Sequence, residues 1–308
     1  MASEDHLTVR ALRGREDLDL FRSIPYVLNE ELEGDLDAGR RQLDRLWVAL
    51  RANTLVGRVG WWARSAADPP LALDILDVSD VDDGVRLVET AMRAVLPAGS
   101  TPPGYIRFLP PDWASDPALV RDVEVRRAVL ERLGARPLVE RLRLQWDAGG
   151  PVPEPNWRLR FRAVADRAEL VGLMISVLEG TLDAHSRVEL TRMTPAEQAN
   201  FQYDDELARY TTPREWWRVA TLPDGTPVGF VIPARNAYNP MIAYIGVLPA
   251  FRGNGYVDDV LAEGTRILAA QGAPRIRAAT DVGNGPMARA FARAGYATFE
   301  RQLDMTWS

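Results

Sequence analysis

Apolar residues recur along the chain at two periods, and these periods predict alternating strands and helices. Alternating or short continuous apolar runs are typical of β-strands, whereas apolar residues three and four positions apart are typical of one helix face. In the C-terminal half, the segments with strand character are 157–164, 216–222, 228–233, 241–247 and 275–280. The segments with helical spacing are 170–178, 257–270 and 286–294.

Local signals mark where several of these elements begin and end. Thr194-Pro195-Ala196-Glu197 is a capping box with proline at the first helical position, so a further helix should begin at Pro195. Pro223-Asp224-Gly225 is a turn that joins two strands into a hairpin. Mixed strands with helices on both faces predict an α/β sandwich built on a mixed sheet.

The end of the chain repeats a pattern found at its middle. Trp146 follows Gly134 by 12 positions, and Trp307 follows Gly295 by the same 12 positions. A second pair of matching segments lies upstream of these blocks, at 54–59 and 226–231. The common order of the matches predicts a tandem duplication.

The duplication defines the expected domains. We expect an N-terminal domain over 1–148, a linker over 149–156 and a C-terminal domain over 157–308. Glycine and proline crowd the linker and disfavour both helix and strand there. The length of 308 residues also favours two domains, at roughly 100–200 residues per domain.

Composition narrows the possible chemistry. The chain has no cysteine, and all 37 of its basic residues are arginine. A thiolate nucleophile, a cysteine zinc site and a Schiff-base lysine are therefore excluded, and no metal is expected. The net charge of −6 argues against a nucleic-acid partner. The first residues are polar and acidic, and no apolar run approaches the roughly 20 residues of a membrane span, so we expect a cytoplasmic protein with no membrane partner.

One segment carries the chemistry, at the end of the strand 241–247. The sequence Ile245-Gly246-Val247-Leu248-Pro249-Ala250-Phe251-Arg252-Gly253-Asn254-Gly255-Tyr256 leads from this strand through glycines into a helix. Main-chain N–H groups at a helix start have no helical partner and form an anion site suited to a pyrophosphate. Glycine lets the backbone approach such a group closely, and Arg252 adds a cation.

This segment resembles motif A of the GNAT acetyltransferases, in which Val-x-Pro-x-x-Arg-Gly-x-Gly precedes an amphipathic helix. Further along, the stretch from Asp281 to Tyr296, with Asn284 opening a helix that ends in Gly-aromatic, is similar to the family's motif B. The resemblance covers 157–308 well and 7–147 loosely. It implies two GNAT-like domains in tandem and an acetyl-CoA site in the C-terminal one.

The resemblance also assigns residues to the cofactor. Ile245 and Val247 would pair their main-chain groups with the pantetheine arm, and Asn284 would lie near the pantetheine or adenine side. An alternative for Asn284 is a helix N-cap alone. The residues expected to bind the pyrophosphate through main-chain amides are Arg252, Gly253, Asn254, Gly255, Tyr256 and Val257.

The sequence departs from the family at its catalytic positions. Phe291 stands where a tyrosine often acts as general acid, and Met241 stands where some members carry a glutamate base. Only His6 and His185 are histidines, and His185 lies in a loop that borders the acceptor site in GNAT-like folds. We expect a water-relayed base that draws on His185 or a nearby acidic residue, and Tyr244 is the candidate acid. Lesser candidates are Tyr238, Glu179, Asp183 and Glu189.

The N-terminal copy has lost the cofactor motif. Its equivalent turn has no arginine and no Gly-x-Gly, and carries Asp80, Asp82 and Asp83 instead. Carboxylates at close range would oppose a pyrophosphate, so we expect a degenerate, supporting domain.

Two functions remain open at this point. The first is an N-acetyltransferase that transfers an acetyl group from acetyl-CoA to a primary amine of a small molecule. The alternative is a non-catalytic acyl-CoA-binding module, which the missing tyrosine and glutamate favour. Nucleotide binding by the glycine turn lacks any Gly-Lys-Ser/Thr signature.

Overall fold

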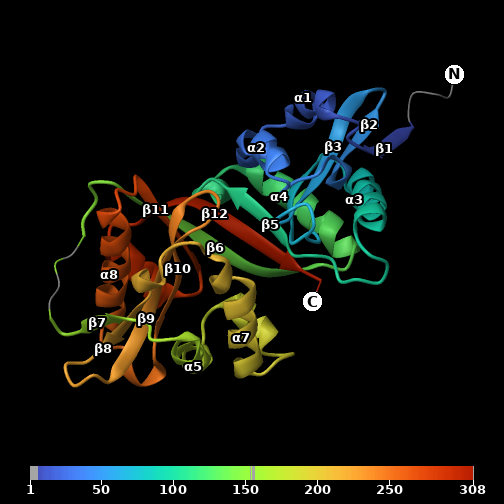
Figure 1. The fold of residues 1–308 in the computed structure, drawn as a ribbon. Helices are drawn as coiled ribbons and strands as arrows, with labels where there is room; N and C mark the ends of the chain where they lie inside the picture. The colour runs from blue at the N-terminus through green and yellow to red at the C-terminus, as the bar shows by residue number, and fades with distance from the viewer. Residues whose placement is uncertain (1–5, 153, 155–156, 308) are drawn as a thin grey trace. The chain divides into compact units, whose positions relative to one another are not determined.

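The computed structural model describes residues 6–152, 154 and 157–307, which form two compact units (Figure 1). The first unit comprises 1–139 and 302–308, and the second comprises 140–301. The expected linker over 149–156 thus falls within the range of the second unit, and its residues 153, 155 and 156 lie outside the described residues.

The second unit is built on a mixed sheet in the order β6-β11-β10-β9-β8-β7. The β10–β11 pair is parallel, and the other neighbours in this unit are antiparallel. The predicted α/β sandwich on a mixed sheet is therefore confirmed. The strands are β6 (Arg136–Asp147), β7 (Arg160–Ala163), β8 (Arg218–Thr221), β9 (Pro227–Arg235), β10 (Pro240–Val247) and β11 (Arg275–Asp281).

Two predicted strands are shorter than expected at their starts. Trp157 has a φ of +63°, which is outside the extended region, so β7 begins three residues later. Trp216 ends a short 3₁₀ helix, and β8 begins at Arg218.

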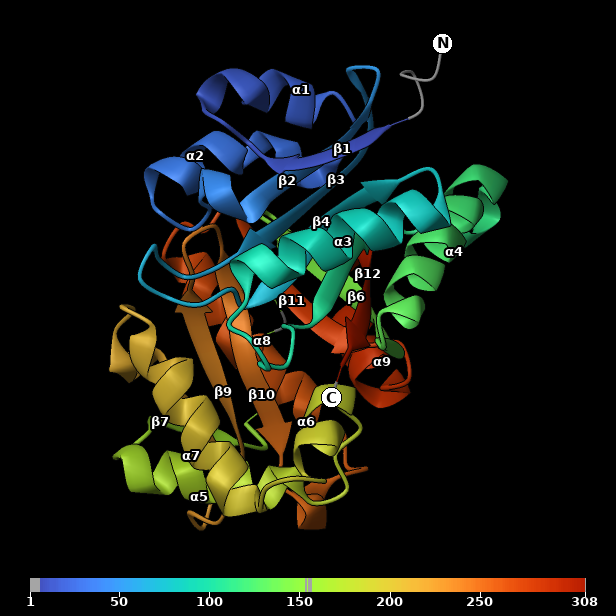
Figure 2. The ribbon, with the colours of Figure 1, turned by 90° about the vertical axis from the view of Figure 1, so that its right-hand side faces the viewer.

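In the described part of the second unit, five α-helices accompany this sheet. They are α5 (Arg167–Leu178), α6 (Ala184–Glu189), α7 (Pro195–Asp205), α8 (Tyr256–Ala270) and α9 (Gly285–Arg293). The capping box that predicts the start of α7 is present: the Thr194 hydroxyl accepts from the Glu197 N–H, and the Glu197 carboxylate accepts from the Thr194 N–H. In Figure 2, α5 and α7 lie on the near side of β9 and β10.

Strand alternation divides the apolar side chains of this unit into two cores. Phe230 and Ile232 of β9 pack with α5 and α7, whereas Val231 between them packs with α8. Successive side chains of a strand point to opposite faces, so a single strand contributes to both cores. The sheet is buried on both sides, and the loops at its ends remain accessible for a functional site.

The first unit has a similar plan, in the order β1-β2-β3-β4-β5-β12. Its strands are β1 (Leu7–Ala11), β2 (Leu46–Arg51), β3 (Thr54–Trp62), β4 (Ala72–Val78), β5 (Tyr105–Leu109) and the end of β12 (Ala297–Thr306). Its α-helices are α1 (Leu18–Arg22), α2 (Leu32–Asp37), α3 (Val81–Val95) and α4 (Pro117–Arg132). One core packs under α3 and α4, and another under α1 and α2.

Two strands pass from one unit to the other. Residues 140–147 of β6 belong to the second unit, where they pair antiparallel with β11 from Arg275 to Asp281. Residues 302–308, which include the end of β12, belong to the first unit, and Met305 and Trp307 pack in its core. The second unit therefore contains the end of β6, the last strand of the first repeat, and the first unit contains the end of β12, the last strand of the second repeat.

Candidate active site and cofactor-binding turn

The two parallel strands of the second unit separate toward their carboxyl ends. Among the described residues, β10 and β11 share one register pair, Met241 with Arg277. A bulge between Ile242 and Tyr244 follows directly in β10. Beyond the bulge, β10 continues to Val247 without a partner on its β11 side, which leaves main-chain groups of that edge available to a ligand.

Strand geometry decides which groups face this opening. The Leu248 N–H donates to Val228 O of β9 at 2.8 Å. Main-chain groups of alternate residues point to opposite edges of a strand, so those of Ile245 and Val247 face away from β9, toward β11. These are the two residues expected from the sequence to bind the pantetheine arm.

A glycine turn joins the end of β10 to α8. Gly253 and Gly255 have φ values of +82° and +73°, a region that disfavours other residues. Gly255 is the N-cap of α8, and no side chain caps the helix. Within the described chain, the main-chain N–H groups of residues 253–257 donate to no protein acceptor. A Cβ built on Gly253 would meet nothing within 4 Å, so the turn is open to an anion.

Arg252 has a different task from the one its motif position suggests. Its main-chain N–H donates to Pro249 O. Its guanidinium donates to three main-chain carbonyls, Val247 O at 3.1 Å, Val177 O at 2.8 Å and Glu179 O at 2.6 Å. The side chain therefore ties the glycine turn to the end of α5.

The two aspartates in the first turn of α8 are each paired with an arginine. Asp258 accepts from Arg293 at 2.7 Å, and Asp259 accepts from Arg158 at 2.5 Å. Arg158 also donates to Asn254 O at 3.3 Å and lies 5.3 Å above the Tyr256 ring. These pairs offset the negative charge beside the turn. No sequence signal points to Arg158, which is 101 positions before Asp259.

The second motif lies at the start of α9. The Asn284 Oδ1 accepts from the Met287 N–H at 3.3 Å, which is the N-cap contact. Phe291 is buried in the core and packs against Tyr296 with ring centroids 5.1 Å apart. The position at which related proteins often place a tyrosine is thus filled here by a core side chain.

Tyr244 lies on the side of β10 that faces α5 and α7. Its ring packs edge-on against Phe230, with the centroids 5.0 Å apart. Burial raises the pKa of the Tyr244 hydroxyl, and the charges of Asp183 and Glu206 raise it further. The hydroxyl therefore stays protonated at neutral pH and borders two carboxylates.

Three titratable side chains come from the start and body of α6. Asp183 is its N-cap and accepts from the Ser186 N–H at 2.8 Å. Burial raises the pKa of Glu189 and the Asp183 charge adds to this, while His185 and a hydrogen bond from Gln198 act in the opposite direction. The structure thus brings His185, Asp183 and Glu189 together, as candidates from one loop and helix.

Asp281, at the end of β11, adds a buried carboxylate that the sequence did not indicate. It is 2% exposed, and its Oδ2 accepts from the Ala184 N–H at 2.7 Å. Arg141 of β6 lies 3.0 Å from its Oδ1 and 3.8 Å from Asp183. Burial raises the pKa of Asp281, with a further contribution from Asp183, and this outweighs the opposing effects of the Ala184 hydrogen bond and of Arg141.

The other sequence candidates lie elsewhere. Tyr238 is in the turn between β9 and β10, at the opposite end of β10 from the glycine turn. Glu179 is exposed, and its main-chain carbonyl is bound by Arg252. Trp217 is buried against α5 and α7.

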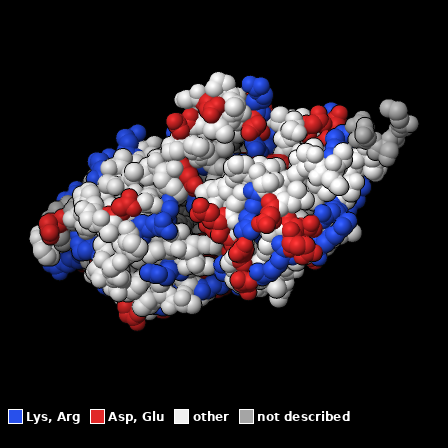
Figure 3. Space-filling model, turned by 90° about the horizontal axis from the view of Figure 1, so that it is seen from above, with Lys and Arg blue, Asp and Glu red and all other residues white. Residues whose placement is uncertain are grey.

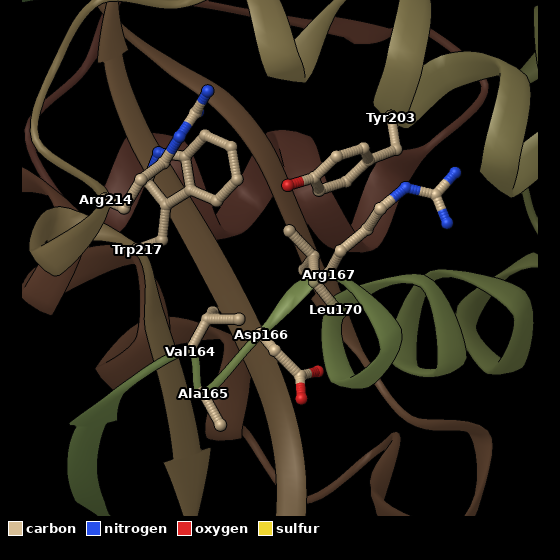
Figure 4. Close-up of a pocket in the computed structure, with 8 residues that line it drawn as sticks. All are labelled: Val164, Ala165, Asp166, Arg167, Leu170, Tyr203, Arg214 and Trp217. Atoms are coloured by element: carbon tan, nitrogen blue, oxygen red, sulfur yellow. The ribbon is translucent and has the colours of Figure 1, made fainter.

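A pocket of about 150 Å³ lies at the other end of α5 (Figure 4). The Arg214 guanidinium stacks 4.0 Å from the Trp217 ring, and Arg167 stacks 5.0 Å from Tyr203. Its lining residues are Val164, Ala165, Asp166, Arg167, Leu170, Tyr203, Arg214 and Trp217. Residues 164–167 and Leu170 lie at the start of α5, Tyr203 lies on α7, and Arg214 and Trp217 lie just before β8, whereas the glycine turn contacts the end of α5.

The corresponding place in the first unit is occupied by its own side chains. β4 and β5 also share one register pair among the described residues, Leu73 with Tyr105. The carboxylate of Asp80 caps α3, accepting from Asp82 and Asp83 N–H at 2.9 and 3.0 Å. A carboxylate thus takes the helix amides that a pyrophosphate would need.

The described residues were also compared with the requirements of a metal site and of a membrane-spanning helix, and they meet neither. Groups of three or more His, Cys, Asp or Glu side chains arranged to hold a metal ion were not found among them. Of the helices that the structure describes, none is long and apolar enough to cross a membrane. On the face in Figure 3, acidic and basic side chains are interspersed in small groups.

Comparisons with known proteins agree with this geometry. Residues 183–296 match the model of the acetyltransferase (GNAT) family, a range that includes α6, β10, the glycine turn, α8 and β11. The comparison with curated proteins gave no significant match.

Solved structures with the same fold include several GNAT proteins. A GCN5-related N-acetyltransferase from Sphaerobacter thermophilus aligns with a TM-score of 0.60 and 17% identity, over 97% of this chain and 95% of that chain. A tandem GNAT protein from the clavulanic acid biosynthesis pathway aligns at 0.53 and 17%, over 98% of both chains. A glucosamine N-acetyltransferase region of a fungal β-N-acetylglucosaminidase aligns at 0.56 and 15%, over 99% of this chain and 38% of that chain.

Residues 183–296 carry a domain of the GNAT acetyltransferase family, and the fold of the whole chain is similar to that of solved GNAT proteins, one of them a tandem GNAT protein. Proteins of this family transfer an acyl group from acetyl-CoA, and the second unit carries the part of the chain that matches the family model.

Proposed function

We propose that this protein is an N-acetyltransferase that transfers an acetyl group from acetyl-CoA to a primary amine of a small molecule. The observation that carries the proposal is the opening between β10 and β11, which runs into a turn with five main-chain N–H groups that lack an acceptor among the described residues. Acetyl-CoA supplies the activated acetyl group as a thioester.

The residues around the opening fit this cofactor. The amides of 253–257 would hold its pyrophosphate, and the main-chain groups of Ile245 and Val247 would hold its pantetheine arm. The carbonyl of Val247 already accepts from Arg252, so its N–H is the group left to polarise a thioester carbonyl. Asn284 and Arg158 border the opening from α9 and from the segment before β7.

The side chains beyond the opening fit an amine acceptor. An amine reaches the protein as an ammonium ion, and Asp183, Glu189 and Asp281 place negative charge near it. His185 or Glu189 would accept a proton from the ammonium, so that nitrogen attacks the acetyl carbonyl. The carbon–nitrogen bond forms, the carbon–sulfur bond breaks, and the thiolate takes a proton from the Tyr244 hydroxyl or from water.

A thiol-release assay with acetyl-CoA and a panel of amines tests the proposal. The panel should include amino acids, polyamines, aminosugars and amine-bearing antibiotics, and mass spectrometry should detect the acetylated product. Thiol release that depends on one class of amine supports the proposal. Thiol release without an acetylated product contradicts it.

The alternative is an acyl-CoA-binding module without turnover. The features that favour it are Phe291, which is a core residue, and Met241, which pairs with Arg277 at the last contact of β10 with β11. Neither side chain can transfer a proton. Binding of acetyl-CoA together with no turnover across the panel would establish this alternative.

A further inference from the structure

The segment that joins α5 to α6 is held at both of its ends by side chains that lie at the ends of β10 and β11, the two strands that border the opening. At one end, the Arg252 guanidinium donates to Val177 O at 2.8 Å and to Glu179 O at 2.6 Å. At the other end, the Asp281 carboxylate accepts from the Ala184 N–H at 2.7 Å. Arg252 follows β10 and Asp281 ends β11, so a residue at the end of each strand holds one end of the segment.

The conformation of this segment depends on the Arg252 contact. Gly180 has a φ of +62°, and a Cβ added to it would lie 3.4 Å from the Arg252 Nη1. The chain therefore turns tightly over the guanidinium. Three residues later, Asp183 caps α6 and the helix carries His185 and Glu189.

Asp281 is held firmly enough to serve as the second anchor. It is 2% exposed, and Arg141 lies 3.0 Å from the oxygen that does not bind Ala184. The register of β6 on β11 places Arg141 directly opposite Asp281. The sheet register thus places a cation beside the carboxylate, whose other oxygen accepts from the Ala184 N–H at the start of α6.

We propose that Arg252 and Asp281 are positioning residues that hold residues 179–184 across the end of the opening and so set the place of Asp183 and His185 at the acceptor site. The identification of this place as an acceptor site rests on the proposed function, whereas the anchoring of the segment does not depend on catalysis. Because Arg252 also adjoins the glycine turn, a ligand bound at the turn restrains the residue that holds the acceptor segment. Cofactor and acceptor should thus bind with positive coupling.

Hydrogen exchange without any substrate tests the anchoring directly. In Arg252→Ala and Asp281→Ala, the amides of residues 180–187 should exchange about tenfold faster or more, since charge-assisted hydrogen bonds are lost. Asp281→Asn keeps an oxygen that accepts from Ala184 and should restore most of the protection. Arg214→Ala is the matched control, because Arg214 also donates to two main-chain carbonyls, Leu207 O and Ala208 O, which lie outside the segment.

Kinetics with an amine substrate provide the second measurement. Arg252→Ala and Asp281→Ala should raise the KM for the acceptor by about tenfold or more, and should change the affinity for CoA by less than about threefold. Arg252→Lys, which keeps a donor near the carbonyls, should recover part of the acceptor KM.

The outcomes separate the two proposals. Faster exchange in both alanine variants, with no turnover of any amine, upholds the anchoring and removes the proposed function. Unchanged exchange at 180–187 overturns the anchoring whatever the activity. A loss of CoA affinity in Arg252→Ala that exceeds the loss for the acceptor, with unchanged exchange, would make Arg252 a phosphate ligand instead.

Discussion

The Nε of Arg126 in α4 donates to the main-chain carbonyl of Leu76 in β4 at 2.7 Å. Its Nη2 donates to Asp77 at the same distance, and Arg58 and Arg107 also contact Asp77. The first unit thus fills the opening between its own parallel strands with buried ion pairs. Binding a pantetheine arm there would require breaking buried pairs, which is costly.

We therefore expect one CoA site per chain. Isothermal titration calorimetry should return a stoichiometry near one, because Arg126 already binds a main-chain carbonyl of β4 and Asp80 already binds main-chain N–H groups at the start of α3, the groups that a cofactor would need. Two equivalent sites would show that these side chains are displaced by the ligand and do not exclude it.

Gly255→Asp should abolish CoA binding, and Gly255→Asn is its matched control. Both replacements meet the same left-handed backbone, with a φ of +73°, which Asn and Asp tolerate best among other residues. Only aspartate adds a negative charge beside the amides expected to hold the pyrophosphate. Aspartate should lower the CoA affinity at least about tenfold more than asparagine, because losing one charge-assisted hydrogen bond has an effect of about this size. Equal affinities in the two variants would place the pyrophosphate elsewhere.

His185→Ala should lower kcat/KM by about 10²–10⁴-fold, the usual effect of losing one general acid or base. The pH–rate profile should also lose the acidic-limb break that a histidine base produces around neutral pH. An unchanged rate and profile would transfer the role to Glu189, whose pKa burial raises.

Tyr244→Phe should lower kcat and leave CoA affinity unchanged. The replacement removes one hydroxyl and keeps the edge-on ring contact with Phe230. Stopped assays at saturating acetyl-CoA, combined with calorimetry, measure the two quantities separately. An unaltered kcat would mean that water protonates the leaving thiolate.

Glu189→Gln should raise the melting temperature at neutral pH and not at acidic pH. The folded-state pKa of Glu189 is raised, so the stability that its neutral form provides is lost as the pH rises through that pKa. Glutamine cannot ionise, and its amide can donate to the Gln198 Oε1, a buried oxygen without a partner among the described residues. The gain should be on the order of 2 °C at pH 7–8 and vanish near about pH 4. A gain that is equal at both pH values would exclude the charge as its cause.

The sequence predicted the elements whose signals are local. The capping box at Thr194 and the strand 241–247 depend on neighbouring residues, and both are confirmed. The strand predicted to begin at Trp157 begins later, because the residues from Trp157 onward alternate like a strand while the backbone of Trp157 is left-handed.

The sequence could not reveal contacts that arise from register and packing. Asp281 meets Arg141 only because β6 pairs with β11 in one register, 140 positions apart in the chain. The motif at Arg252 predicts a residue at the phosphate, but it contains no signal that the guanidinium donates to the carbonyls at the end of α5. The cofactor and catalytic roles themselves stay predictions.

The boundaries of the sequence repeats and of the folded units differ by part of one strand. Residues 140–147 end the first repeat but belong to the second unit, and residues 302–308 end the second repeat but belong to the first unit. A deletion or recombination event at the Gly/Pro-rich boundary would therefore remove sheet residues from both units, and not one unit cleanly. Once the strands had been exchanged in this way, neither copy could be lost without damaging the other. An inactive copy would then be retained by the fold of its active neighbour, even if it had no ligand of its own.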